Sequence, residues 1–105
     1  MHVHVISKSP FSKAAEKYPN DRQSIMDVYN VLRRGTFNSP AVLRGVFPSL
    51  DNFKYQKRWW VIDIGGNNLR LIAAIQFVHQ RVYVKYIVTH AEYDKLNSRY
   101  LKGEL

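Results

Sequence analysis

The chain has 105 residues, 46% of them hydrophobic, and this size predicts one compact domain over residues 1–105. Sixteen Lys and Arg against eight Asp and Glu give a formal net charge of +8, which favours polyanionic partners such as nucleic acid but also serves solubility alone. The absence of cysteine excludes disulfides, thiolate catalysis and cysteine-ligated zinc, and it agrees with a reducing cytoplasm.

The first twenty residues predict a strand and then a helix. Apolar alternation over residues 2–7 indicates a strand rather than a signal peptide. His2 and His4 share one face of that strand, but without Cys or a nearby carboxylate they make a poor zinc site. Ser9 is the expected N-cap of a short helix over Pro10–Tyr18, with proline at the first helical position.

A longer amphipathic helix is predicted next. Ile25–Leu32 carries apolar side chains at the i, i+3, i+4 and i+7 spacing of one helix face. Asn20 and Gln23 have the spacing of a capping box, so the helix is expected to begin at Asn20. The Ser39–Pro40 pair predicts a further short helix that ends near Val46, and residues 49–53 are expected to form a loop.

The second half of the chain predicts three strands. Trp59–Ile64 is rich in aromatic and β-branched residues, and the Gly65–Asn68 cluster is typical of a turn. Leu69–Val78 and Arg81–Thr89 then alternate in polarity and are expected to form a hairpin. Helices followed by such strands predict an α+β fold with an antiparallel sheet whose apolar face packs on the helices.

The alternation also predicts which side chains share a face of the sheet. One face should carry Leu69, Leu71, Ala73, Ile75, Phe77, Val82, Val84, Tyr86 and Val88. The opposite face should expose a group of cations and one tyrosine together, namely Arg70, Arg81, Tyr83 and Lys85.

The start of the last predicted helix holds one candidate site. Thr89 and Glu92 have the spacing of a capping box, so the helix should begin there with His90 in its first turn and Tyr93 one turn later on the same side. Free N–H groups at a helix N-terminus suit a phosphate, and His and Tyr can each move a proton. The spacing alone favours the alternative, an ordinary junction histidine and a core tyrosine.

Arg70 is a second candidate because it interrupts a mostly apolar strand directly after the glycine turn. A guanidinium at this position could clamp a phosphate and stabilise the charge that develops on it. The alternative is a structural ion pair across the hairpin with Asp63, and the sequence does not decide between the two.

A basic run interleaved with aromatic residues, Lys54–Trp60, is a third candidate. Cations can hold a nucleic-acid backbone while aromatic rings stack on its bases. The same pattern also describes a solvated strand edge guarded by Lys, with a tryptophan in the core.

Three blocks of the sequence, Val46–Tyr55, Gly65–Arg70 and Thr89–Asp94, resemble the HigB toxin family within the broad RelE-like group. Their order and spacing agree with the family, and the N-terminal helix fits as well, so the resemblance covers nearly the whole chain. It implies a RelE-like α+β fold, with N-terminal helices packed on one face of an antiparallel sheet and a short C-terminal helix.

The resemblance further implies a cytoplasmic toxin of a type II toxin–antitoxin pair that inhibits translation. Its expected activity is ribosome-dependent, metal-independent cleavage of mRNA by the substrate's own 2′-OH, with no cofactor. Its expected partner is a helix-turn-helix antitoxin of the HigA type, through which alone it would contact operator DNA. A non-catalytic toxin of the same fold group, acting on gyrase or by binding RNA, is the alternative.

The resemblance assigns roles to particular residues. His90 would be the general acid or base, Arg70 would stabilise the phosphate, and Asn68 and Tyr93 would orient the substrate or stack on a base. The residues expected to hold mRNA or ribosomal RNA are Lys54, Lys57, Arg58 and Lys85.

Overall fold

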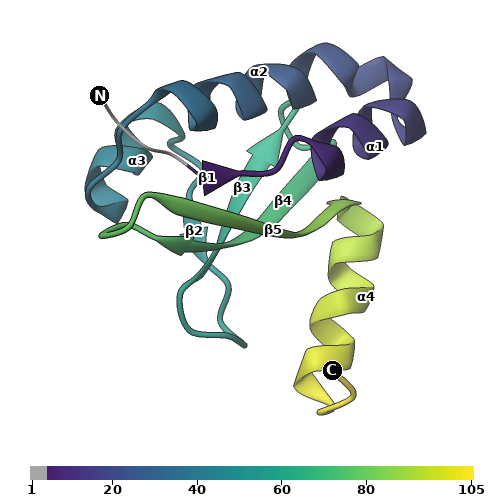
Figure 1. Cartoon of the computed structure of the whole chain (residues 1–105). Coiled ribbons are helices and arrows are strands. Elements are labelled where there is room, and N and C mark those ends of the chain that lie inside the picture. Colours follow the sequence, from purple (N-terminus) through teal and green to yellow (C-terminus); the bar gives the residue numbers. More distant parts are fainter. Residues whose placement is uncertain (1–4) are drawn as a thin grey trace.

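The computed structural model describes residues 5–105, so His2, His4 and most of the first predicted strand lie outside the described part. Three helices lie on one side of a sheet and a fourth extends from the other side (Figure 1). The elements, in chain order, are β1 (Val5–Ile6), α1 (Ser9–Lys17), a 3₁₀ turn η1 (Pro19–Asp21), α2 (Arg22–Arg34), α3 (Pro40–Val46), β2 (Asp51–Asn52), β3 (Trp59–Ile64), β4 (Leu69–Gln76), β5 (Arg81–Thr89) and α4 (His90–Leu101). This arrangement confirms the predicted α+β fold.

The sheet has the strand order β1-β5-β4-β3-β2. β3, β4 and β5 pair antiparallel in chain order, as predicted. β2 also pairs antiparallel with β3, whereas β1 pairs parallel with β5. A parallel pair needs a long crossover connection, and here the whole chain from α1 to β4 separates β1 from its partner. No helix within residues 5–105 is long and apolar enough to cross a membrane.

The predicted start is confirmed for α3 but not for α1 and α2. Ser39 caps α3, because its hydroxyl accepts a hydrogen bond from the Val42 N–H, as predicted. The capping box predicted at Asn20 is wrong: Asn20 lies in η1, α2 begins at Arg22, and the Gln23 amide donates to Asp27 instead. The N-cap predicted at Ser9 is also wrong, because Ser9 is already the first residue of α1.

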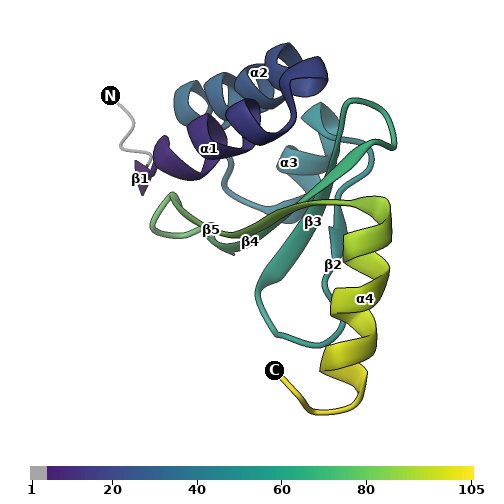
Figure 2. The same ribbon diagram turned by 90° about the vertical axis from the view of Figure 1, so that its right-hand side faces the viewer.

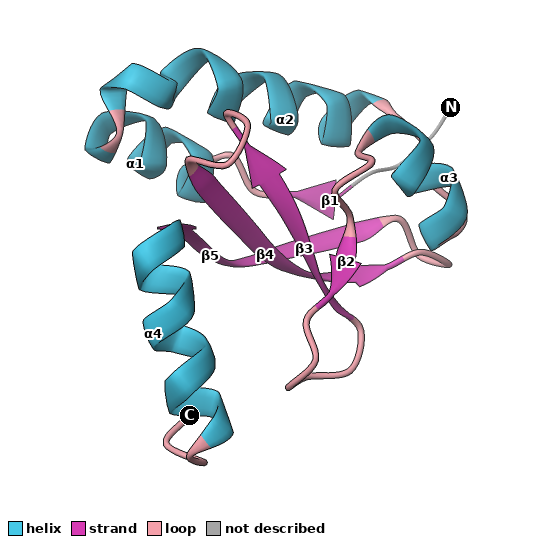
Figure 3. Ribbon diagram, turned by 180° about the vertical axis from the view of Figure 1, so that it is seen from behind, coloured by secondary structure: helices cyan, strands magenta, loops and turns pink. Residues whose placement is uncertain are grey.

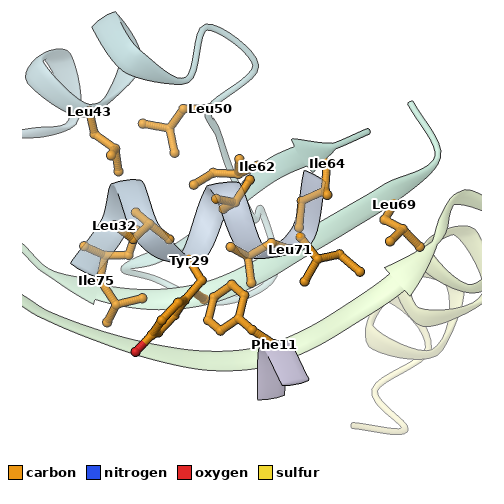
Figure 4. Close-up of a cluster of buried hydrophobic side chains, with 14 of the residues drawn as sticks. Phe11, Tyr29, Leu32, Leu43, Leu50, Ile62, Ile64, Leu69, Leu71 and Ile75 are labelled. Atoms are coloured by element: carbon orange, nitrogen blue, oxygen red, sulfur yellow. The ribbon is translucent and has the colours of Figure 1, made fainter. Parts of the chain in front are cut away.

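The helices on the first face of the sheet bury an aliphatic core (Figure 4). The predicted apolar face of α2 is confirmed, and it packs with side chains from α1, α3 and strands β3, β4 and β5. The members that are at most 1% exposed are Phe11, Ile25, Leu32, Leu43, Ile62, Ile64, Leu69 and Leu71. Burying one such aliphatic side chain contributes about 1.5–3 kcal/mol, so this face supplies most of the fold's stability.

Strands β3 and β5 have the predicted bounds, but the β4–β5 turn and the region before β3 differ from prediction. β4 ends at Gln76 because residues 77–80 already form the turn, which leaves Val78 89% exposed. Gln80 supplies the positive φ that a glycine would otherwise provide, and its amide bonds to the Phe37 N–H and C=O. Asp51–Asn52 form the two-residue strand β2 inside the predicted loop 49–53.

A β-bulge in β5 overturns part of the predicted face assignment. Ile72 pairs with Tyr86 and Ala73 with Val84, so Lys85 is an extra residue without an opposite partner. From the bulge onward the alternation is shifted by one position. Tyr86 therefore lies on the second face rather than with Val84, and Ile87 packs on the first face instead.

α4 covers half of the second face of the sheet, away from α1–α3 (Figures 2 and 3). Leu96 of α4 packs on Val61 and Ile72, with Phe53 from the chain between β2 and β3 beside them. Five half-buried aromatic residues surround this small core: Tyr55, Trp59, Tyr86, Tyr93 and Tyr100. We call these nine residues the aromatic cluster.

Candidate functional site

The first turn of α4 is fixed by the capping box that the sequence predicts. The Thr89 hydroxyl accepts a hydrogen bond from the Glu92 N–H at 3.2 Å, and the Glu92 carboxylate accepts one from the Thr89 N–H at 2.9 Å. The helix therefore begins directly where β5 ends. His90 and Tyr93 are placed at this junction, one helical turn apart on the same side.

A polar link from α1 holds the same turn. The Tyr18 hydroxyl donates to Glu92 Oε1 at 2.8 Å, and Lys17 Nζ lies 3.8 Å from Glu92 Oε2. The pKa of Glu92 is lowered, first by the Thr89 N–H and then by the Tyr18 hydroxyl, so Glu92 stays ionised. Burial, together with the bond to Glu92, raises the pKa of Tyr18, which keeps its donating proton. The end of α1 is thus tied to the start of α4.

His90 offers an accessible imidazole at this junction. Its side chain is 49% exposed, and Nδ1 lies 3.6 Å from Asp94 Oδ2, which is an ion pair only when the ring is protonated. Asp94 contacts Nδ1, so Nε2 is the ring nitrogen that this contact does not use. An exposed imidazole with a carboxylate beside it can exchange protons with a bound substrate.

Arg70 lies under the same helix and is held by three neighbours. Its guanidinium donates to Asp63 at 2.9 Å and to Asn67 at 3.1 Å, and it sits 4.9 Å from the centroid of the Tyr93 ring. The structural partner considered from the sequence, Asp63, is therefore present. Arg70 Nε is buried and has no hydrogen-bond partner among the described residues. The Arg70 side chain as a whole is 20% exposed, so part of it is open to a ligand from solvent.

These contacts bring three predicted residues to one corner of the molecule. Arg70 of β4 packs on Tyr93 of α4, and His90 lies one turn before Tyr93 on the same side of that helix. The corner combines a guanidinium, a phenol and an imidazole beside the N-terminus of α4. Such a group can bind a phosphate and transfer protons on either side of it.

Asn68 is placed differently from the other predicted site residues. Its amide donates to Asp21 at the start of α2, at 3.0 Å, so it ties the turn to the helices of the first face. Asn67 contacts Arg70 instead, and this contact was not predictable because neighbouring turn residues can point to either side of the chain. The turn depends on Gly65, which has φ +63° and whose position for a Cβ lies 2.7 Å from Asp21 Oδ1.

The predicted basic residues surround the aromatic cluster. Lys54 Nζ lies 5.1 Å from the centroid of the Tyr55 ring, and Lys85 Nζ lies 5.4 Å from that of the Trp59 ring. Lys57 and Arg58 are exposed on the chain between β2 and β3. Arg70 likewise lies over Tyr93, so three aromatic rings of the cluster each have a cation beside them. Such a surface suits a nucleic acid, which combines charged phosphates with flat bases.

Tyr100 anchors α4 to this surface and was not predicted as part of it. Its ring stacks on Tyr55, with centroids 6.0 Å apart and an interplanar angle of 12°. Its hydroxyl lies 3.3 Å from that of Tyr86, and burial together with this contact raises the pKa of Tyr100 to about 12. The sequence signal was its i+4 spacing from Leu96, which indicates only a buried helix face.

Comparison with known proteins gives consistent results. The family model of the HigB toxin, a RelE-like toxic component of a toxin–antitoxin system, matches residues 21–96, which include every site residue predicted from the sequence. A protein of Escherichia coli O6:H1 named mRNA interferase HigB is 52% identical over 102 residues, 97% of this chain and 99% of the relative. Proteins of Escherichia coli K12, named mRNA interferase toxin HigB, and of Shigella flexneri, named mRNA interferase HigB, are each 41% identical over 92 residues, 88% of each chain.

Proposed function

The chain belongs to the HigB family, the RelE-like toxic component of a toxin–antitoxin system, and on this basis we propose that it is an mRNA interferase that cuts messenger RNA in the decoding site of the ribosome. It acts as a single RelE-like domain. The observation that carries the proposal is the corner where Arg70 packs on Tyr93 and His90 stands one turn away. The curated relatives, which cover almost the same length, are named mRNA interferases.

The proposed reaction uses the substrate's own ribose and needs no metal. A base removes the proton of the 2′-OH, the 2′ oxygen attacks the adjacent phosphorus, and the bond to the 5′ oxygen of the next nucleotide breaks as an acid protonates that oxygen. The products are a 2′,3′-cyclic phosphate and a free 5′-OH. His90 supplies one of the two proton transfers, because its side chain is 49% exposed and lies beside the Asp94 carboxylate.

Arg70 stabilises the negative charge that accumulates on the phosphorus oxygens. Its bonds to Asp63 and Asn67 fix the plane of the guanidinium. Tyr93 orients the substrate beside Arg70. Asn68 contributes through the turn that it ties to Asp21, since its amide is already engaged there.

RNA is held by the cations around the aromatic cluster. Lys54 and Lys85 lie over Tyr55 and Trp59, so they can contact phosphates while bases approach the rings. Lys57 and Arg58 extend this basic surface along the exposed chain between β2 and β3. The toxin acts in the cytoplasm, and a helix-turn-helix antitoxin of the HigA type neutralises it.

Expression of His90→Ala and Arg70→Lys variants beside the parent tests the proposal. The parent should arrest translation before DNA replication and produce transcript ends inside codons, detected by primer extension. Both variants, folded to the same melting temperature, should lose these cuts. Arg22→Ala, which removes an exposed cation from α2, is the matched control and should cut like the parent. Folded variants that still cut would contradict the assignment, and arrest of replication first would favour a gyrase poison.

A further inference from the structure

The second face of the sheet is only partly covered by α4, and its open half combines aromatic and basic side chains. α4 covers the rows of the sheet around Arg70 and Ile72, where Tyr93 and Leu96 pack. Two rows follow farther along the strands, and Tyr100 of α4 reaches the first of them at Trp59, with ring centroids 6.2 Å apart. The register places Trp59, Ala74 and Tyr83 side by side in the first of these rows, and Gln76 and Arg81 opposite each other in the next.

The row around Ala74 has the shape of a stacking platform. Ala74 is the small central residue, with an indole on one neighbouring strand and a phenol on the other. Tyr83 is 42% exposed although it is a large side chain with apolar carbon. Neighbouring strands lie about 4.8 Å apart, so Trp59 and Tyr83 stand about 10 Å apart on either side of Ala74. The Trp59 ring stacks on Phe53, with centroids 5.8 Å apart, so Tyr83 is the ring that this row leaves accessible.

Charge on this half of the face has one sign. Arg81 and Lys85 are exposed beside Tyr83, and Arg58 precedes Trp59 on the neighbouring strand. The two open rows contain no acidic residue, and Asp63, on the covered half, is paired with Arg70. Past Gln76 the strip ends in a hollow of about 450 Å³ that Arg58 and His79 help to line.

We propose that this strip, defined by Trp59, Ala74, Tyr83 and Arg81, is a subsite for single-stranded mRNA beside the scissile link, an inference that rests on the proposed function. A base stacks on the exposed Tyr83 ring beside Ala74, and Arg81 and Lys85 contact the phosphates that flank it. Ala74 lies four residues from Arg70, about 13 Å along the strand, so the base belongs to a nucleotide near the cut rather than at it.

The test measures RNA binding without cleavage. The full chain carrying His90→Ala is titrated against an unstructured, fluorescently labelled twelve-nucleotide RNA, with Tyr83→Ala, Tyr83→Phe, Arg81→Ala and Arg22→Ala added singly. Tyr83→Ala removes the stacking ring and should weaken RNA binding by about fivefold to a hundredfold. Tyr83→Phe keeps the ring and should retain most of the affinity. Arg81→Ala should weaken binding and lower the slope of log affinity against log salt by about 0.7, whereas Tyr83→Ala should leave the slope unchanged.

Three outcomes of this experiment support or overturn the proposed subsite. Weaker RNA binding by Tyr83→Ala and Arg81→Ala, with Arg22→Ala unchanged, supports the subsite. Equal affinities of Tyr83→Ala and the parent overturn it. Unchanged oligonucleotide binding with weaker binding to vacant ribosomes also overturns it, because the face then contacts the ribosome rather than mRNA. Failure of the proposed function is separate: it would show as cleavage that survives His90→Ala, whatever the result at Tyr83.

Discussion

The two faces of the sheet carry different kinds of side chain. The first face, under α1–α3, is packed with aliphatic side chains that are almost fully buried. The second face carries the aromatic cluster, most of whose rings are half-buried and three of which lie under a cation. Aliphatic packing stabilises a fold without recognising anything, whereas accessible rings beside cations suit nucleic acid. One sheet thus separates stability from function.

Two polar links connect the faces. Asn68 joins the turn before β4 to Asp21 at the start of α2, and Tyr18 joins the end of α1 to Glu92 in α4. Both links end close to the corner that holds Arg70 and His90. The first face therefore also positions the site on the second face, and substitutions can be ordered by which of the two they disturb.

The largest effect on stability is expected in the first face. Leu71→Ala removes a side chain with no exposed surface and should lower the free energy of unfolding by about 2–5 kcal/mol, measured by urea denaturation. Tyr83→Ala, on the open half of the second face, should cost less than about 1 kcal/mol because the ring is already 42% exposed. Equal losses for the two variants would break the proposed division between the faces.

The next effect concerns the turn that joins the faces. Gly65 and Gly66 both have positive φ, so alanine at either should cost about 1 kcal/mol, but only a Cβ at Gly65 would meet Asp21 Oδ1. Gly65→Ala should therefore lower the melting temperature more than its matched control Gly66→Ala. If the two melting temperatures agree, the close approach of Asp21 to this turn does not matter for stability.

A smaller effect should appear at low pH. The pKa of Glu92 is lowered in the folded chain, so the stability it contributes is present above the unfolded value of about 4.3 and is lost as pH falls through the folded value. Glu92→Ala should cost about 1 kcal/mol at pH 7 and progressively less as pH falls below the unfolded value, by denaturant melts over a series of pH values. A cost independent of pH would show that the carboxylate charge is not involved.

The smallest effect is expected at Tyr18. Tyr18→Phe keeps the ring and removes only the hydroxyl that donates to Glu92, so it should cost about 0.5–1.5 kcal/mol. Cleavage should fall more than RNA binding does, because the variant loosens the turn that holds His90 and leaves the cations around the aromatic cluster in place. Loss of affinity with an unchanged cleavage rate would show that Tyr18 has a different role.

Local signals in the sequence were sufficient for much of this molecule. The bounds of β3 and β5, the cap of α3 at Ser39 and the capping box at Thr89 follow from residue types over a few positions, and they are confirmed. Features that depend on distant residues were not predictable. The bulge at Lys85 moves Tyr86 to the second face of the sheet. This was not predictable, because the periodicity of a sequence does not reveal an extra residue in one strand.

The candidate site was likewise predictable in part: its residues from local signals, but not how they come together. The sequence identified Arg70, His90 and Tyr93 individually, and their meeting at one corner needed the pairing of β4 with β5 and the packing of α4. Asn68 was predicted to face the substrate, but a partner 47 residues away engages its amide. Asn67 and Tyr100 were missed because a turn position and a helix-face tyrosine have no distinctive local signal.

Analysis of the RNA ends formed on purified ribosomes tests the central claim most directly. A defined mRNA, ribosomes and the purified chain are mixed with a metal chelator added at a level that leaves the ribosomes intact, and the fragments are read by mass spectrometry. We predict a cut inside a codon that leaves a 2′,3′-cyclic phosphate and a 5′-OH and that is absent with His90→Ala. Fragments with a 3′-OH and a 5′-phosphate, or the same cut by the His90→Ala variant, would contradict the account.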